Sequence, residues 1–199
     1  MAYIKMVPPE DADGLLAEMY EQDMAGVGYA PNYTRAMSLR PDMIQAWRSL
    51  NSTLKSGMDL RLYELATFAA AVAMKSSYCS LAHGNVLRSR FFSDEQVARI
   101  AQDYRHAGLE PAEVALMAYA EKITLDASSV TQEDIDGLKS CGYSDEEILS
   151  IALAATARCF FSKTLDAVGA EPDSSYMEMD NDLRQALAVG RPIAHRSEE

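Results

Sequence analysis

Hydrophobic positions along this chain recur at helical spacing in nearly every segment. Apolar residues three or four positions apart lie on one face of a helix, and such patterns fill most of the sequence. No stretch alternates apolar and polar residues with the period of two that strands show. The pattern therefore predicts an all-α fold with essentially no sheet.

Start and stop signals divide this pattern into separate helices. Prolines and capping residues open helices, and glycines commonly end them. The predicted helices cover residues 10–24, 32–39, 41–57, 59–74, 79–90, 93–108, 111–123, 131–138, 148–168 and 176–187. An extended arm, residues 1–9, precedes them, and a polar tail, residues 189–199, follows. We therefore predict a single helical domain over residues 1–188.

Composition and charge narrow the class of protein. Apolar residues make up 48% of the 199 residues, which is enough for a sizeable core. The formal net charge of −12 argues against a nucleic-acid partner, because phosphates require a basic surface. No run of eighteen apolar residues predicts a membrane span, and the first residues lack the apolar core of a signal peptide.

Three cysteines, Cys79, Cys141 and Cys159, form no disulfide framework, which suits a reducing cytoplasm. No two of them have zinc-ligand spacing, and the histidines outside the central stretch, His106 and His195, sit in unrelated segments. We therefore predict a cytoplasmic protein with no metal site and no cofactor.

The stretch from residue 64 to 83 carries the candidate chemistry. Cys79 and His83 are four residues apart, so a helix places their side chains one turn apart on the same face. Ser76, Ser77 and Tyr78 precede a helix that we expect to begin near Cys79. A thiol in the first turn of a helix feels the positive end of the helix dipole, which favours the thiolate.

Glu64 joins this pair only if the chain turns back on itself. In one unbroken helix the fifteen residues to Cys79 span roughly 22 Å, which is too far for proton transfer. A turn at Lys75-Ser76-Ser77 would set Glu64 beside His83; a carboxylate from a neighbouring subunit is the other route. We expect Glu64 to be partly buried among apolar neighbours, with a raised pKa that suits a base.

These residues resemble a known family. Glu64, Ser76-x-Tyr78-Cys79 and His83 resemble the motif of the alkylhydroperoxidase D-like branch of the carboxymuconolactone decarboxylase superfamily. The resemblance implies a Glu, a Cys-x-x-Cys pair and a His at this spacing, so Cys79 matches the second cysteine and Ser76 stands where the first would be. The thiol that closes the family's disulfide is therefore absent here.

The second half of the chain is similar to the same family. Segments such as AYAEKIT and GYSDEEILSIALAATARCFFSKTLDAVGAEPD, with the VPPE near the start, look like its peroxidase-related subgroup. The resemblance implies an alkylhydroperoxidase D-like helical bundle. It also implies a homo-oligomer, a dimer, trimer or hexamer.

Several neighbouring residues have a structural interpretation beside a functional one. Tyr78 can donate a hydrogen bond to a bound oxygen, although a core or interface role is more usual for such a tyrosine. Ser76 can cap a helix. Cys159 lies in an apolar helix and is predicted to be buried, whereas Cys141 sits in a turn and remains open as an internal partner for Cys79.

Three functions follow from this reading. The first is a thiol-dependent peroxidase, in which Glu64 and His83 relay the proton of Cys79 and an external thiol completes turnover because of Ser76. The second is decarboxylase-like acid–base chemistry by Glu64 and His83 on a small organic acid or lactone, with Lys75 and Arg88 as candidate positive groups. The third is an oligomeric binding protein that keeps the scaffold without chemistry.

Overall fold

The computed structural model describes residues 2–195 and is helical throughout that range, with no strand. Its α-helices are α1 (Gly14–Val27), α2 (Asn32–Ala36), α3 (Pro41–Ser56), α4 (Leu60–Ala73), α5 (Ser77–Arg90), α6 (Asp94–Asp103), α7 (Pro111–Asp126), α8 (Gln132–Ser140), α9 (Asp145–Ala167) and α10 (Asn181–Leu187). Short 3₁₀ turns lie at η1 (Pro9–Asp11), η2 (Tyr104–His106), η3 (Ala127–Ser129) and η4 (Ser174–Glu178). The predicted all-α class is confirmed.

Local capping explains most helix starts. The Asp59 side chain accepts hydrogen bonds from the first backbone N–H groups of α4, and Pro41 occupies the first turn of α3. Thr131 and Ser144 open α8 and α9, each in a reciprocal capping box with an acidic residue three positions on. These starts agree with the signals in the sequence.

Three predicted helices are divided in the structure. The segment 10–24 is a 3₁₀ turn followed by α1, because Asp13 is extended and Gly14 has a φ of +47°. The segment 93–108 is α6 followed by the 3₁₀ turn η2, which the Asp103 side chain caps. The segment 176–187 is split into η4 and α10, because the Asp180 side chain caps a new helix start. In the first segment an extended aspartate beside a glycine interrupts the helix. In the other two segments an aspartate side chain accepts hydrogen bonds from backbone N–H groups and so starts a new element.

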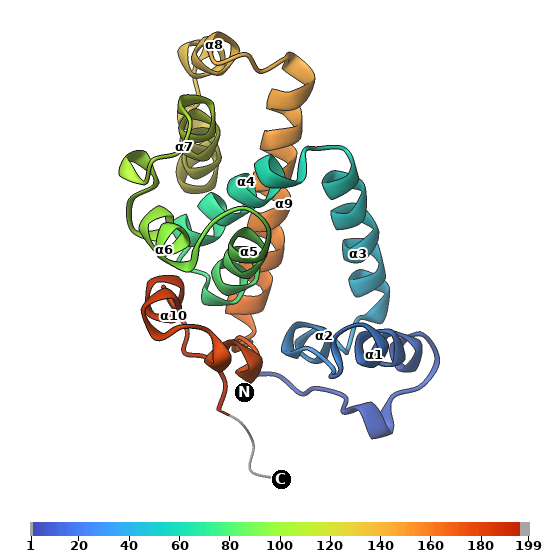
Figure 1. The fold of residues 1–199 in the computed structure, drawn as a ribbon. Coiled ribbons are helices and arrows are strands. Elements are labelled where there is room, and N and C mark those ends of the chain that lie inside the picture. The colour runs from blue at the N-terminus through green and yellow to red at the C-terminus, as the bar shows by residue number, and fades with distance from the viewer. Residues whose placement is uncertain (1, 196–199) are drawn as a thin grey trace.

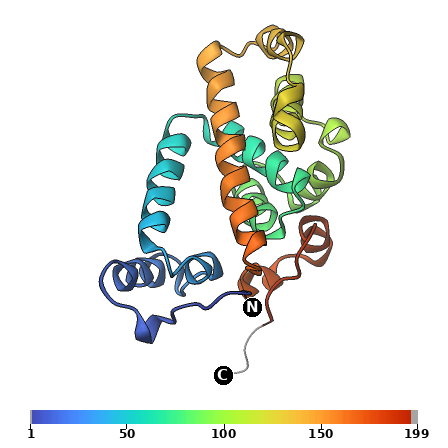
Figure 2. The same ribbon diagram turned by 180° about the vertical axis from the view of Figure 1, so that it is seen from behind.

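Helix α9 runs through the middle of the molecule, and the other helices surround it (Figure 1). Helices α4, α5, α6 and α7 lie on one side of it, whereas α1, α2 and α3 lie on the other (Figure 2). By length and composition α9 also meets the minimum for a membrane span. Its contacts with α4 and α7 are those of a core helix in a bundle.

Two hydrophobic clusters hold the bundle together. The larger cluster contains residues of every helix from α4 through α10. Its almost fully buried members include Leu65, Phe68, Leu116 and Ile151. Alanines on α4 are also buried, and their small side chains allow the neighbouring helices to approach closely. The interior position of α4 follows from this composition.

The smaller cluster attaches α1, α2 and α3 to the bundle. The Trp47 ring of α3 stacks on the Phe161 ring of α9, with centroids 4.4 Å apart and planes 8° from parallel. Cys79 belongs to this cluster and has 1% of its surface exposed. The thiol therefore lies where α3 covers the bundle.

A tight turn connects α4 and α5 at the position that the sequence predicts. Lys75 adopts a left-handed conformation with a φ of +56°, which reverses the chain between Ala73 and Ser77. The two helices consequently run side by side in opposite directions. This hairpin brings Glu64 of α4 and His83 of α5 together within one chain.

Both ends of the chain return to the bundle. The Tyr3 backbone N–H donates to the Val168 carbonyl oxygen at the end of α9. Residues 189–195 of the predicted tail also pack on the bundle, since the Gly190 N–H donates to Ser77 Oγ at the start of α5. Residues 1 and 196–199 of the predicted arm and tail lie outside the described range.

Gly190 generates a prediction about this attachment. A Cβ atom there would lie 2.0 Å from the Lys75 carbonyl oxygen, which belongs to the backbone of the α4–α5 turn. Gly190→Ala should therefore lift this segment off the turn and lower the free energy of unfolding by about 1–3 kcal/mol. Thermal unfolding and amide hydrogen exchange of residues 188–194 would measure this effect.

Gly137→Ala on α8 is the matched control, because nothing lies within 4 Å of its Cβ position. There the helix propensity of alanine should raise the free energy of unfolding by roughly 0.5–1 kcal/mol. Equal stability of the Gly190→Ala variant and the wild type would contradict the close approach.

Candidate functional site

Cys79 lies in the first turn of α5. The helix begins at Ser77, two residues earlier than predicted, with Ser76 at the capping position. The Ser76 side chain makes no capping hydrogen bond to α5, so the predicted cap is wrong although the helix start is close. The thiol remains near the positive end of the helix dipole.

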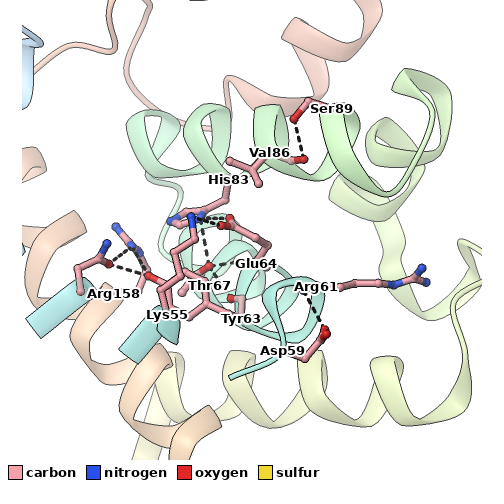
Figure 3. A network of polar contacts seen from close by, with 11 residues as sticks. Lys55, Asp59, Arg61, Tyr63, Glu64, Thr67, His83, Val86, Ser89 and Arg158 are labelled. Carbon is pink, nitrogen blue, oxygen red and sulfur yellow. Dashed lines mark hydrogen bonds and ion pairs between the residues drawn. The ribbon is translucent and has the colours of Figure 1, made fainter. Parts of the chain in front are cut away.

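Glu64 and His83 form a buried pair across the α4–α5 hairpin (Figure 3). The distance from Glu64 Oε2 to His83 Nδ1 is 2.6 Å, and Thr67 Oγ1 lies 3.1 Å from the same nitrogen. Lys55 of α3 places its Nζ 3.5 Å from the other carboxylate oxygen, Oε1. Glu64 therefore contacts an imidazole and an ammonium group at once.

The surroundings of Glu64 and His83 favour an ionised carboxylate and a neutral imidazole. Burial raises the pKa of Glu64, but the His83 hydrogen bond and charge, with Lys55, outweigh it and hold the pKa below its ordinary value. Burial and then the charge of Arg158 lower the pKa of His83, although Glu64 opposes them. A carboxylate accepts hydrogen bonds only, so Nδ1 carries the imidazole proton and Nε2 keeps its lone pair.

The expected raised pKa of Glu64 is therefore wrong. Burial acts in the expected direction, but the sequence does not reveal that two positively charged or chargeable groups meet the carboxylate. The base of this pair is the Nε2 atom of His83, with Glu64 as the group that orients it.

Cys79 meets Arg158 of α9. Arg158 Nη1 lies 3.6 Å from Cys79 Sγ, and both side chains are almost fully buried. No hydrogen bond joins Cys79 to His83 within residues 2–195. The predicted Cys79–His83 pair therefore shares a helix, but the imidazole bonds to Glu64 and the thiol to a guanidinium that sequence spacing did not indicate.

Arg158 lies at the junction of four helices. Its guanidinium is 5.3 Å from the Trp47 ring centroid and 5.5 Å from that of Phe161. Its Nη2 lies 3.3 Å from Asn51 Oδ1 and 3.4 Å from Tyr63 Oη. Among the described residues no carboxylate forms an ion pair with it, so a buried positive charge faces the thiol.

Arg158, and neither of the two basic residues that the sequence suggested, is the positively charged group in contact with Cys79. Lys75 is exposed in the α4–α5 turn, and Arg88 pairs with Asp94 at 3.0 Å. A lone arginine in the apolar run ATARCFF was the available signal, because an arginine is rarely buried unless it is paired. The sequence contained no indication of its partners Asn51 and Tyr63.

Tyr78 has a structural role in this arrangement. Its hydroxyl donates to Asp173 Oδ2 at 2.5 Å and accepts from the Tyr33 backbone N–H at 3.1 Å. Burial, followed by the nearby carboxylate, raises its pKa well above the ordinary value. The tyrosine thus ties α5 to α2 and to the segment after α9, which is the core role that the sequence favoured.

The other two cysteines lie apart from this site. Cys141 ends α8 and Cys159 approaches Thr124 Oγ1 at 3.7 Å, and both are free and partly exposed. The expected burial of Cys159 is therefore wrong, because its side of α9 is only partly covered where it meets Thr124 of α7. The described residues contain no group of three His, Cys, Asp or Glu side chains placed for a metal.

The arrangement combines a nucleophile, a positive charge and a base in a nearly dry space. A guanidinium beside a thiol stabilises the thiolate, and an imidazole oriented by a carboxylate can accept and return a proton. The same carboxylate–imidazole pair can also move a proton on a bound acid without the thiol. Both chemistries are open to this geometry.

One protein-family model matches part of this chain. Residues 41–122 match the model of the carboxymuconolactone decarboxylase family. This segment runs from α3 into α7 and contains Glu64, Cys79 and His83, but not Arg158. No curated protein matches the sequence significantly.

Solved structures share the fold over nearly the whole chain. An uncharacterised peroxidase-related protein from Ralstonia eutropha JMP134, described as an alkylhydroperoxidase AhpD core, is 20% identical with a TM-score of 0.81. The match covers 96% of this chain and 98% of that one. A peroxidase-related protein from Silicibacter sp. TM1040 is 21% identical with a TM-score of 0.79, over 89% and 95% of the two chains.

A third similar structure is the debrominase Bmp8 in complex with 2,3,4-tribromopyrrole. It is 18% identical with a TM-score of 0.70, over 94% of this chain and 98% of that chain. At these identities the structures establish the fold and leave the reaction open. Residues 41–122 therefore belong to the carboxymuconolactone decarboxylase family, and the chain as a whole has the fold of the alkylhydroperoxidase AhpD core.

Proposed function

We propose that this protein is a thiol-dependent peroxidase that reduces small hydroperoxides at Cys79. The observation that carries the proposal is the buried Arg158 guanidinium, which lies 3.6 Å from Cys79 Sγ and has no carboxylate partner among the described residues. A buried cation without a fixed counter-ion favours an anion beside it. The thiolate, which is the nucleophilic form of cysteine, is that anion.

The reaction starts with removal of the thiol proton by His83 Nε2, directly or through a water molecule. The thiolate sulfur attacks the terminal oxygen of the hydroperoxide, so a sulfur–oxygen bond forms and the oxygen–oxygen bond breaks. His83 returns the proton to the leaving oxygen, which departs as an alcohol. Sulfur is oxidised to a sulfenic acid while the peroxide is reduced by two electrons.

Regeneration of Cys79 requires two further thiol equivalents. The first attacks the sulfenic acid to give a mixed disulfide and water, and the second releases the Cys79 thiol with a disulfide as product. Ser76 cannot supply a thiol, so we propose a small external thiol as reductant. Small size matters because Cys79 is enclosed by α3 and α9.

The names of similar structures are consistent with this proposal. Two of them are called peroxidase-related, at about 20% identity to this chain. In the debrominase complex the protein is a variant in which a cysteine is replaced by alanine. These names support chemistry at a thiol and do not specify the substrate of this chain.

A second candidate is acid–base catalysis on a small organic acid or lactone. The observation that favours it is the Glu64–His83 pair, which is complete at 2.6 Å without any contact to Cys79. Arg158 would then bind the carboxylate of the substrate. In this reaction the thiol is dispensable, so the two candidates differ in their need for Cys79.

Replacement of Cys79 by serine tests the first proposal. Peroxide exposure of the wild-type protein with a sulfenic-acid trap should label Cys79, and Cys79→Ser should abolish both this label and peroxide consumption with an external thiol, because a hydroxyl is not oxidised in this way. Mass spectrometry of the trapped peptides measures the label.

Cys141→Ser and Cys159→Ser are the controls and should retain the label on Cys79, since neither thiol has a polar contact with this site. Absence of label on the folded wild type would overturn the peroxidase proposal. Turnover of an organic acid that survives Cys79→Ser would establish the second candidate instead.

The Glu64–His83 pair generates a pH prediction. The imidazole must be neutral to accept a proton, and its pKa is lowered by burial and by Arg158. The rate of Cys79 oxidation should therefore hold as pH falls through about 6.5, the ordinary histidine value, and decline only below it. A series of single-turnover rates from pH 8 to pH 5 would measure this profile.

Glu64→Gln separates orientation from charge in the same assay. The variant loses the carboxylate that fixes Nδ1–H, so the plateau rate should fall about a hundredfold. Its acid limb should not move to higher pH, because removal of a negative charge further disfavours the imidazolium. A limb that moves upward with an unchanged plateau would contradict this role of Glu64.

A further inference from the structure

The two buried charged side chains of the site, Glu64 and Arg158, differ in whether a group of opposite charge lies beside them. Glu64 contacts both His83 at 2.6 Å and Lys55 at 3.5 Å, so its negative charge is answered from two sides. Arg158 is buried, with only 5% of its surface exposed, and yet it forms no ion pair within residues 2–195. Its Nε atom also lacks a hydrogen-bond partner in this range. The buried carboxylate of this cluster, Glu64, thus pairs with His83 and Lys55 and not with the Arg158 guanidinium.

Asn51 supplies what a carboxylate would otherwise supply. Its single carbonyl oxygen, Oδ1, accepts a hydrogen bond from Tyr63 Oη at 2.6 Å and another from Arg158 Nη2 at 3.3 Å. Tyr63 Oη in turn lies 3.4 Å from the same Nη2. One neutral oxygen therefore fixes the phenol and one edge of the guanidinium, while Nη1 remains directed at Cys79 Sγ.

Asn51 belongs to a row of residues on α3 that faces the site. Trp47, Asn51 and Lys55 are four residues apart in turn, so they lie on one face of the helix. Trp47 lies against the Arg158 guanidinium, Asn51 accepts from it, and Lys55 pairs with Glu64. Each residue of the row thus contacts one component of the buried cluster, and the central contact is uncharged.

From this arrangement we infer that Asn51 is a positioning residue that orients Arg158 and Tyr63 through a neutral oxygen, which leaves the guanidinium charge available to Cys79. The inference relies on the proposed function only in taking Cys79 as the reacting group. An aspartate has nearly the same shape and accepts the same hydrogen bonds, but its charge would pair with the guanidinium and weaken the field at sulfur.

Other titratable groups also act on Cys79. The buried phenols of Tyr63 and Tyr176 interact electrostatically with it from α4 and η4, and the Asp173 carboxylate acts on Tyr176. His83 on α5 feels Arg158, Glu64 and Lys55. All of these side chains remain in place in a substitution at Asn51. Because aspartate keeps the oxygen that accepts from Tyr63 and Arg158, a difference between Asn51→Asp and the wild type reports on the added charge.

Asn51→Asp is the critical variant, and its reporter is the alkylation of Cys79 by iodoacetamide, followed by mass spectrometry of the Cys79 peptide from pH 5 to pH 10. The rate at pH 7 should fall roughly tenfold or more, and the pH of the half-maximal rate should rise by about one unit, since one unit corresponds to a factor of ten. Peroxide is not needed for this readout.

Asn85→Asp is the matched control. Asn85 Oδ1 accepts from Arg88 Nε at 3.1 Å, so the substitution places the same charge beside an arginine on the exposed side of the helix that carries Cys79. The rate and pH profile of Cys79 alkylation should be those of the wild type. A wild-type profile in Asn51→Asp, or an equal shift in both variants, would overturn the inference.

Asn51→Ala keeps the test decisive if Asn51→Asp does not fold, which circular dichroism and thermal unfolding would show. The alanine removes the shared oxygen without adding charge, so the plateau rate should fall severalfold while the half-maximal pH stays near that of the wild type. A wild-type plateau would exclude positioning by Asn51. If peroxide fails to oxidise Cys79 while alkylation behaves as described, the peroxidase proposal falls and the role of Asn51 stands.

Discussion

A positive charge that has no carboxylate partner among residues 2–195 lies buried in this bundle, and four helices meet around it. Arg158 of α9 is buried against the aromatic rings of Trp47 and Phe161 and contacts groups from α3, α4 and α5. Removing a guanidinium from water is costly unless other groups replace the water. Here the replacements are a carbonyl oxygen, a phenol, a thiol and two aromatic faces, so these helices must pack in one arrangement for the charge to be tolerated.

The α4–α5 hairpin provides the Glu64–His83 pair, and its geometry depends on close helix packing and on a left-handed turn residue. Alanine-rich α4 allows its neighbours to approach closely, and the left-handed Lys75 sets the two helices antiparallel. Glu64 and His83 then face each other in the interior, where His83 helps to keep the carboxylate ionised and the carboxylate orients the imidazole. The thiol with its guanidinium and the carboxylate with its imidazole are thus two neighbouring units, linked through the electrostatic effect of Arg158 on His83.

The face of helix α3 that contacts both units extends from the buried interior to the solvent-exposed surface. Lys55 is the partly exposed member of the cluster, while Asn51 and Trp47 lie deeper along the same face. A site assembled from two packed layers, with α3 on one side and α4, α5 and α9 on the other, excludes water from the thiol and strengthens every electrostatic interaction within it. The family segment, residues 41–122, supplies the first three of these helices and α9 lies outside it.

The sequence by itself determined the helical class, most helix starts and the position of the turn that could set Glu64 beside His83; the structure decided that the two residues meet within one chain. These features depend on interactions within a few residues, such as the capping boxes at Thr131 and Ser144, or on the equal distance of two residues from one turn. The tertiary structure decided which group contacts Cys79. Arg158 is 79 positions away from it along the chain, and Asn51 is 107 positions from Arg158. No local pattern encodes such contacts, because they arise only when the packed helices bring those faces together.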